Sequence, residues 1–278
     1  MKYLNYDERP DFPPPAMEYH ERASALAAQV TGTDYAFGSH PLQTLTVFPA
    51  AEPTGEILLV IHGGRWRHGY REHMSLFAPP LNRRGITVVS SSYRLAPGDP
   101  FPAGFQDSAL ALRWIGDNIA ALGGRSDAIF VGGHSAGGHY AALLAIDPTS
   151  AAVSDLPPIA GCLPVSGVFK VGLDTVPGPI LFPDGATDEE YRVSSPLDLD
   201  VAGKPPFLIV WGEDDDPIVK ADSIALADKI KAVRGEVETL IIEGKDHFGA
   251  GLEAAEPDSV LIAHMEGFMR KHRAPMAV

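Results

Sequence analysis

The stretch at residues 128–142, Ala-Ile-Phe-Val-Gly-Gly-His-Ser-Ala-Gly-Gly-His-Tyr-Ala-Ala, decides the fold. At its centre, Gly133-His134-Ser135-Ala136-Gly137 fits a G-x-S-x-G pattern, in which a serine occupies a sharp turn between a strand and a helix. Side chains at 133 and 137 would collide with neighbouring elements, so the turn needs glycine at both positions. We therefore predict that Ser135 is an exposed nucleophile at a helix N-terminus, where the helix dipole favours developing negative charge.

Strand and helix signals alternate on both sides of this turn. Continuous or alternating apolar runs predict strands at residues 42–48, 57–61, 86–92, 128–132, 159–165, 207–211 and 237–242. Apolar residues at helical spacing predict helices at residues 17–30, 77–84, 105–122, 137–146, 218–233 and 260–272. This alternation is typical of an α/β fold with a mostly parallel central sheet flanked by helices.

We expect one domain over residues 1–278, with residues 1–40 as an N-terminal extension. Residues 168–200 break the pattern with Gly, Pro and Asp and short apolar pieces. Such an excursion near the carboxyl ends of the strands predicts either a short lid-like insert that faces the substrate or an ordinary surface excursion.

A serine hydroxyl is a weak nucleophile until a base takes its proton. In a fold of this type the acid and the histidine follow the serine in loops after late strands. His247 is the only histidine in such a loop, because His264 and His272 fall on the last predicted helix. His139 lies inside the helix that follows the turn, where we expect a structural role. We therefore predict that His247 is the general base.

Three contiguous aspartates follow the strand at 207–211, in Gly-Glu-Asp-Asp-Asp-Pro at residues 212–217. The acid must hold the Nδ1 proton of the histidine, which fixes the tautomer and stabilises the imidazolium. The other aspartates are expected to be solvated or to cap the helix that begins near Pro217. Our choice is Asp215, with Asp216 second and Asp214 third.

The tetrahedral intermediate of acyl transfer needs backbone amides around its oxyanion. His62-Gly63-Gly64, directly after the strand at 57–61, fits a loop that supplies one such amide, and the residue after the nucleophile, Ala136, supplies the other. The sequence leaves open whether the loop amide that donates to the oxyanion is that of Gly63, Gly64 or Arg65. His62 itself is expected to organise the loop by hydrogen bonding.

Composition excludes several classes of function. The formal net charge of −14 argues against nucleic acids and anionic membrane surfaces as partners. No apolar run approaches the ~20 residues that span a bilayer, and the first residues lack the apolar core of a signal peptide, so we expect a cytoplasmic protein. The single cysteine, Cys162, lies in an apolar run and predicts a buried structural thiol.

No cofactor or metal is expected, because neither a zinc-type histidine pair nor a phosphate-binding glycine loop is found in the sequence. The expected partner is a small ester or amide substrate. The oligomeric state, including a homodimer, is left open.

Most of the chain resembles the α/β-hydrolase superfamily, and two of its branches compete. The kynurenine formamidase branch resembles this chain in an HGG-x-W loop at 62–66, Ser166-Gly167-Val168-Phe169, Ser195-Pro196, Asp215-Asp216-Pro217 and His247-Phe248. Hormone-sensitive-lipase-like carboxylesterases are similar in Tyr93-Arg94-Leu95-Ala96-Pro97 and Pro100-Phe101-Pro102. The Asp-Asp-Pro spacing of the formamidases favours Asp215 as the acid.

The formamidase resemblance implies hydrolysis of an N-formyl arylamine by Ser135 and His247, with Arg65 and Trp66 at the substrate. A local basic cluster (Arg65, Arg67, His68, Arg71 and His73) would then bind a substrate carboxylate. Arg65 departs from that branch, which has an aromatic or aliphatic residue there. The alternatives are a carboxylesterase acting on short-chain acyl esters and a non-catalytic ligand-binding protein of the same fold.

Overall fold

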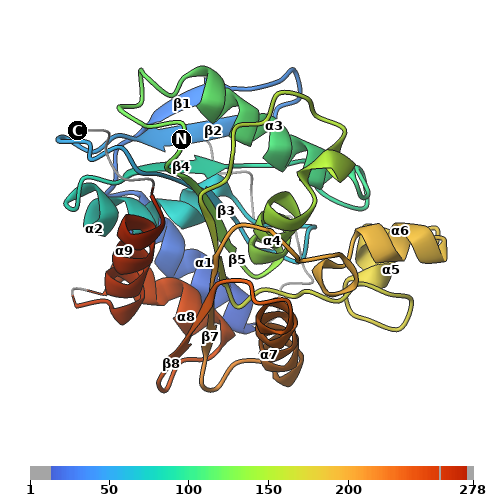
Figure 1. Cartoon of the computed structure of the whole chain (residues 1–278). Coiled ribbons are helices and arrows are strands. Elements are labelled where there is room, and N and C mark those ends of the chain that lie inside the picture. The colour runs from blue at the N-terminus through green and yellow to red at the C-terminus, as the bar shows by residue number, and fades with distance from the viewer. Residues whose placement is uncertain (1–13, 257, 274–278) are drawn as a thin grey trace.

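The computed structural model describes residues 14–256 and 258–273, and its centre is an eight-stranded sheet (Figure 1). The strand order is β1-β2-β4-β3-β5-β6-β7-β8. β1 and β2 pair antiparallel, β2 pairs antiparallel with β4, and the other neighbours are parallel. The strands are β1 (Thr33–Ala36), β2 (Thr44–Phe48), β3 (Ile57–Ile61), β4 (Thr87–Ser91), β5 (Ile129–His134), β6 (Gly161–Val165), β7 (Phe207–Gly212) and β8 (Val237–Ile242).

Helices cover both faces of this sheet (Figure 1). They are α1 (Pro14–Ala27), α2 (Ala78–Asn82), α3 (Ala103–Asp117), α4 (Ala136–Ile146), α5 (Gly178–Leu181), α6 (Asp188–Val193), α7 (Pro217–Ala232), α8 (His247–Leu252) and α9 (Val260–His272). Short 3₁₀ helices add η2 (Arg71–Phe77), η3 (Pro148–Ala151), η4 (Pro196–Asp198) and η5 (Glu253–Ala255). The predicted α/β fold with a mostly parallel, helix-flanked sheet is confirmed.

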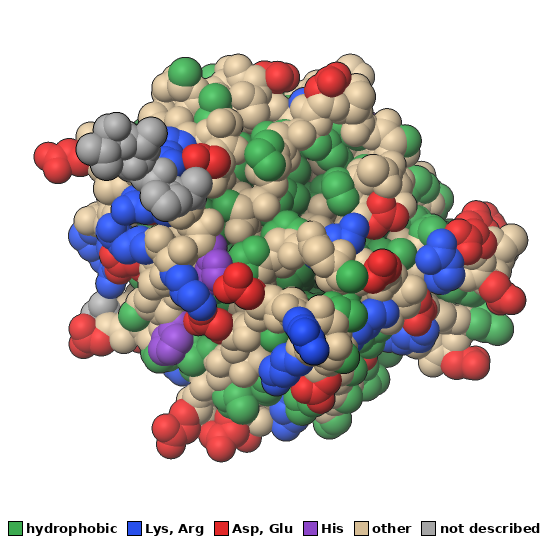
Figure 2. Space-filling view, viewed as in Figure 1, with side chains coloured by type: hydrophobic (Ala, Val, Ile, Leu, Met, Phe, Trp, Pro, Cys, Tyr) green, Lys and Arg blue, Asp and Glu red, His purple; other side chains and the backbone are tan. Residues whose placement is uncertain are grey.

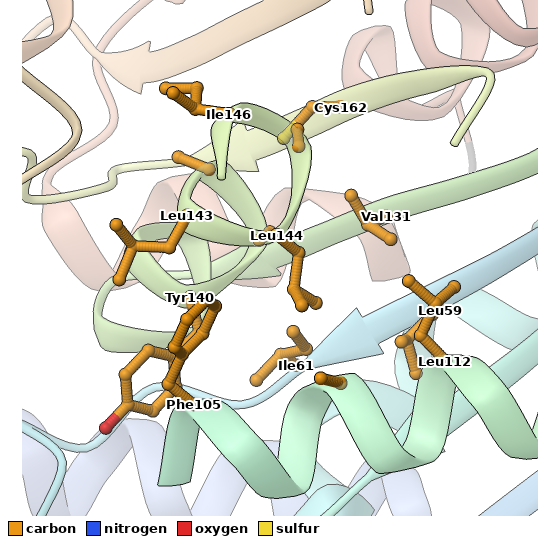
Figure 3. Packing of buried hydrophobic residues seen from close by; sticks show 14 of the residues in the cluster. Leu59, Ile61, Phe105, Leu112, Val131, Tyr140, Leu143, Leu144, Ile146 and Cys162 are labelled. Atoms are coloured by element: carbon orange, nitrogen blue, oxygen red, sulfur yellow. The ribbon is translucent and has the colours of Figure 1, made fainter. Parts of the chain in front are cut away.

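The alternation of side chains along the central strands divides the core into two layers. Ile57, Leu59 and Ile61 of β3 point toward α3, α4 and α7, whereas Leu58 and Val60 point toward α1, α2, α8 and α9. Figure 3 shows the first layer, where Leu112 of α3 and Leu144 of α4 lie over side chains of β3 and β5. Because the central strands are buried on both faces, they read as continuous aliphatic runs in the sequence.

Some elements differ from the sequence prediction. β1 was not predicted, because all four of its residues are exposed and carry no apolar alternation. The helix expected at 77–84 is shorter than predicted: it is α2, which has two prolines and directly follows the 3₁₀ helix η2. The excursion at 168–200 contains α5 and α6, which project from the body at the right of Figure 1.

Charged side chains are spread over the surface. Figure 2 shows Asp and Glu interspersed with Lys and Arg over the visible face rather than gathered into one acidic patch. Many of them are paired, for example Arg270 with Glu266 and Lys271 with Glu238. In the described residues no helix is long and apolar enough to cross a membrane.

Candidate active site

Ser135 lies on a sharp turn between β5 and α4. Its φ of 56° is in the left-handed region, which a residue with a side chain occupies only under strain. A Cβ on Gly133 would come within 2.5 Å of the Ile61 carbonyl oxygen, and one on Gly137 would clash with the same carbonyl group. The Ser135 amide donates to the Val165 carbonyl at 2.9 Å and ties the turn to β6. Both flanking glycines are therefore required by the close approach of β3.

His247 follows β8 and is the first residue of α8, not a residue of an open loop as expected. Its Nε2 lies 3.0 Å from Ser135 Oγ, and its Nδ1 lies 2.9 Å from Asp215 Oδ1. The three side chains follow β5, β7 and β8, and the carboxyl ends of parallel strands meet at one edge of a sheet. The structure thus brings the predicted serine, histidine and aspartate into one hydrogen-bonded line.

Asp215 is the one buried member of the three contiguous aspartates. Besides His247, its carboxylate accepts hydrogen bonds from the amides of Asp216 (2.8 Å) and Gly212 (3.3 Å) and from the Ser166 hydroxyl. Burial raises the pKa of Asp215, but the hydrogen bond and charge of His247, with those other donors, outweigh it and hold the pKa below its ordinary value. Asp215 is therefore ionised and oriented toward the histidine at neutral pH.

The other two aspartates have different positions. The Asp216 side chain accepts from the Ile218 amide at 2.8 Å and caps α7, as expected for one of the three. Asp214 is exposed, and its amide donates to the Lys245 carbonyl. Neither side chain contacts His247.

Ser166 contacts the acid, whereas the sequence analysis named it only as part of the segment at 166–169 and gave it no role. It directly follows β6, is fully buried and has a left-handed φ of 50°. Its amide donates to the Val210 carbonyl at 2.7 Å, and its hydroxyl donates to Asp215 Oδ2. The available signals were the resemblance of residues 166–169 to the formamidase branch and the position of Ser166 at the carboxyl end of a central strand, which many non-functional serines share.

The loop after β3 passes directly beside Ser135. A Cβ on Gly63 would lie 3.1 Å from Ser135 Cβ and 2.9 Å from the His134 carbonyl oxygen. The amides of Gly63, Gly64 and Ala136 donate no hydrogen bond to any residue that the structure describes. These amides are therefore available to an anionic oxygen near Ser135, and the choice between Gly63, Gly64 and Arg65 remains a prediction.

His62 organises this loop, as expected. Its Nδ1–H donates to the Gly63 carbonyl at 2.7 Å, and its ring stacks on Tyr93 with centroids 4.3 Å apart. The Tyr93 hydroxyl in turn donates to the His62 carbonyl at 3.1 Å. Burial lowers the pKa of His62 to about 4, so the ring is neutral at physiological pH.

The predicted substrate contacts of this loop separate in the structure. Arg65 is exposed, whereas Trp66 is only 3% exposed, packs in the core and donates its indole N–H to His139 Nδ1 at 3.2 Å. Arg71 is committed to Asp34 and to the hydroxyls of β2, and His73 is buried against α1. The basic cluster therefore does not form one open patch.

His134 contacts the backbone of His247, the predicted base. Its Nε2–H donates to the His247 carbonyl at 2.8 Å, and its ring lies against Tyr19 of α1. Burial, and next the charge of His247, lower the pKa of His134 to about 4. Tyr19 also packs on Phe248, so that α1 covers the start of α8.

Among residues 14–256 and 258–273, no group of three or more His, Cys, Asp or Glu side chains is arranged to hold a metal ion. The single thiol, Cys162, is buried, and burial raises its pKa well above the ordinary value. The side chains joined by hydrogen bonds at this edge of the sheet are those of Ser135, His247 and Asp215.

Comparison with known proteins gives a consistent result. The model of a family described as alpha/beta hydrolase fold matches residues 58–249. Carboxylesterase NlhH of Mycobacterium tuberculosis is 41% identical over 98 residues, which are 35% of this chain and 31% of that protein. Esterase LipC of the same organism is 27% identical over 267 residues, covering 87% of this chain and 66% of LipC. The chain therefore spans less than two thirds of the length of these relatives.

Solved structures show the same fold at low identity. Esterase B from Lactobacillus rhamnosis superposes with a TM-score of 0.77 at 22% identity, covering 92% of this chain and 94% of that one. The thermophilic carboxylesterase EstE1, cloned from a metagenomic library, gives a TM-score of 0.74 at 24% identity, covering 93% and 96%.

Proposed function

Because this chain belongs to the alpha/beta hydrolase fold family, we propose that it is a serine carboxylesterase that cleaves small, short-chain acyl esters through an acyl-enzyme. The observation that carries the proposal is the line of hydrogen bonds from Ser135 Oγ through His247 to Asp215. A nucleophile, its base and an orienting acid in this order form the arrangement that activates a serine for acyl transfer.

In the proposed reaction, His247 Nε2 takes the proton of Ser135 as the serine oxygen attacks the ester carbonyl carbon. Asp215 accepts the Nδ1–H of His247, which leaves Nε2 free to act as the base and stabilises the imidazolium. The imidazolium then protonates the departing alcohol, and a second cycle with water releases the acid.

The negative charge of the tetrahedral intermediate would fall beside the N-terminus of α4. The Ala136 amide and one amide of the loop at 63–65 are the donors that we propose for this oxyanion. They are preorganised, because the glycine contacts between β3, β5 and α4 hold the backbone in place before substrate arrives.

The names of the relatives favour esters over formamides. NlhH, LipC and EstE1 are called esterases or carboxylesterases, whereas the resemblance to kynurenine formamidases finds no counterpart among them. The burial of His73 and the pairing of Arg71 also remove two members of the cluster that would bind the carboxylate of a formylkynurenine.

The experiment that tests the proposal compares kcat/KM for p-nitrophenyl acetate, p-nitrophenyl butyrate and N-formyl-L-kynurenine, using the native chain and Ser135→Ala. We expect turnover of both esters that exceeds turnover of the formamide and is abolished in the variant. A strong preference for the formamide would restore the formamidase interpretation. A native chain that neither turns over esters nor reacts with a fluorophosphonate probe would leave a non-catalytic binding protein.

A further inference from the structure

The loop beside Ser135 has backbone φ angles that Arg65 and Trp66, as residues with side chains, rarely adopt. Gly64, Arg65 and Trp66 have φ values of 115°, 53° and 57°, so that three consecutive residues lie in the left-handed region. A residue with a side chain is strained in this region, and the conformation persists only where surrounding contacts hold it.

Two long-range hydrogen bonds fasten Trp66, one at each end of the residue. The Ala96 amide donates to the Trp66 carbonyl at 2.9 Å, and the Trp66 indole N–H donates to His139 Nδ1 at 3.2 Å. The indole and imidazole rings meet nearly at right angles, with an interplanar angle of 89°.

The partners of His139 determine its tautomer. Indole N–H is a donor only, so Nδ1 of His139 must accept and the ring proton must be on Nε2. That Nε2–H donates to the Ser194 carbonyl at 2.7 Å. His139 is fully buried, and burial lowers its pKa to about 4, more than the Ser194 bond raises it. The neutral ring therefore keeps one acceptor and one donor in fixed directions.

His139 is also tied closely to the nucleophile. It lies in the first turn of α4, and its amide donates to the Ser135 carbonyl at 3.1 Å. Ser194 ends α6, at the base of the excursion at 168–200. There the Ser195 hydroxyl donates to the Val171 carbonyl and accepts from the Val171 amide, both at 2.8 Å. The buried ring of His139, which is carried on the nucleophile helix, thus joins the strained loop to the C-terminal end of α6.

We propose that His139 is a positioning residue for the proposed esterase reaction, holding Trp66 so that the amides of the strained loop stay aligned with the oxyanion formed at Ser135. The inference rests on the proposed function, and it replaces the purely structural role expected for His139. The hydrogen bond from Trp66 to His139 Nδ1 holds the loop in position. The hydrogen bond from His139 Nε2 to the Ser194 carbonyl fixes the tautomer of the ring and attaches it to the C-terminal end of α6.

Two substitutions at His139 separate these bonds. In His139→Asn, the side-chain oxygen can take the place of Nδ1 and accept from Trp66, whereas in His139→Gln the amide nitrogen can take the place of Nε2 and donate to Ser194. Trp66→Phe removes the indole donor and keeps an aromatic ring. Trp114→Phe, on α3 and packed on Tyr35 of β1, is the matched control for a tryptophan-to-phenylalanine change.

The test measures kcat and KM for p-nitrophenyl butyrate in these variants, together with the Tm. We expect Trp66→Phe and His139→Gln to lower kcat by about tenfold or more with KM changed less than about threefold, because removal of an oxyanion donor lowers kcat about 10²–10³-fold and misalignment lowers it less. His139→Asn should recover most of this loss, and Trp114→Phe should match the native chain. The double variant Trp66→Phe/His139→Gln should be no worse than either single variant, since both break the same bond.

A second readout separates alignment from a general loss of structure. A trifluoromethyl ketone adds to the serine and forms an oxyanion, so its inhibition constant should rise in the same proportion as kcat falls. Native kcat in Trp66→Phe, or equal losses in His139→Asn and His139→Gln, would overturn the inference. A native chain without esterase activity would instead refute the proposed function, so the two failures are distinguishable.

Discussion

The two sides of Ser135 are built differently. On the acid side, Asp215 receives hydrogen bonds from His247, Ser166 and two nearby amides, and all of these groups follow β6, β7 or β8. On the oxyanion side, the loop at 62–66 has three consecutive left-handed residues, which Ala96, Tyr93 and His139 hold from elsewhere in the chain. We therefore expect the acid side to tolerate the loss of one hydrogen bond. The oxyanion loop is held by fewer hydrogen bonds, so we expect the loss of one of them to displace it.

The largest effect is expected for the loss of the nucleophile. Ser135→Ala removes the hydroxyl oxygen that attacks the ester, and kcat for p-nitrophenyl acetate should fall by about 10⁶-fold, as for nucleophile removal in other triads. Circular dichroism should match that of the native chain. If the variant kept more than about a few per cent of the activity, as measured against this expected loss, the assignment of the nucleophile would fail.

Asp215→Asn tests the acid side. The amide would favour the wrong tautomer of His247, and kcat should fall by about 10⁴-fold. Asp214→Asn and Asp216→Asn are the matched controls, since neither side chain contacts His247, and asparagine still caps α7 at position 216. A large loss in a control with normal activity in Asp215→Asn would move the acid role to that neighbour.

The pH dependence of stability should distinguish the buried histidines around the site from the acid, Asp215. The buried rings of His62, His134 and His139 have pKa values lowered from 6.5 to about 4, so the unfolded chain binds more protons between these pH values. Their contribution is complete above pH 6.5 and is lost as the pH falls toward 4, by about 1.4 kcal/mol per pH unit for each ring.

Asp215 also loses its contribution on acidification but at lower pH, because its pKa is lowered from 3.8 and the loss begins only as the pH falls below that value. Urea unfolding at pH 7, 6 and 5 measures the free energy of unfolding in the histidine window. A free energy that stays constant from pH 7 to 5 would show that these rings are not buried as neutral groups.

The smallest effect is expected for Ser166→Ala. Asp215 keeps its three other hydrogen bonds, so kcat should fall only about tenfold, which corresponds to about 1.4 kcal/mol. Ser166→Gly is the matched control, because glycine lacks the hydroxyl but relieves the positive φ. Equal losses in both variants would assign the effect to the hydroxyl. A loss as large as that of Asp215→Asn would contradict the redundancy of the acid side.

The centre of the fold could be predicted because its signals are local. A turn that needs glycine at 133 and 137 follows a strand, and the apolar runs of β3, β5 and β7 reflect burial on both faces. His247 was placed by its position after β8. The structure brings Ser135, His247 and Asp215 within hydrogen-bonding distance of one another, and their catalytic roles stay a prediction.

The rest depends on distant partners. Three adjacent aspartates look alike in sequence, and only burial distinguishes Asp215. Arg71 appeared to belong to a basic cluster, but its partner Asp34 is on β1, a strand with no apolar pattern. Likewise, the bond between Trp66 and His139 spans 73 positions, which no local pattern encodes.

The order of the site residues along the chain has a consequence for synthesis. Ser135 and its base are 112 positions apart, so β6, β7 and β8 are all made between them. At about 5–20 residues per second, a ribosome needs roughly 6 to 22 s to travel from the nucleophile to the base. During that interval Ser135 has been synthesised but its proton acceptor has not, so the nascent chain lacks the base that activates the serine hydroxyl.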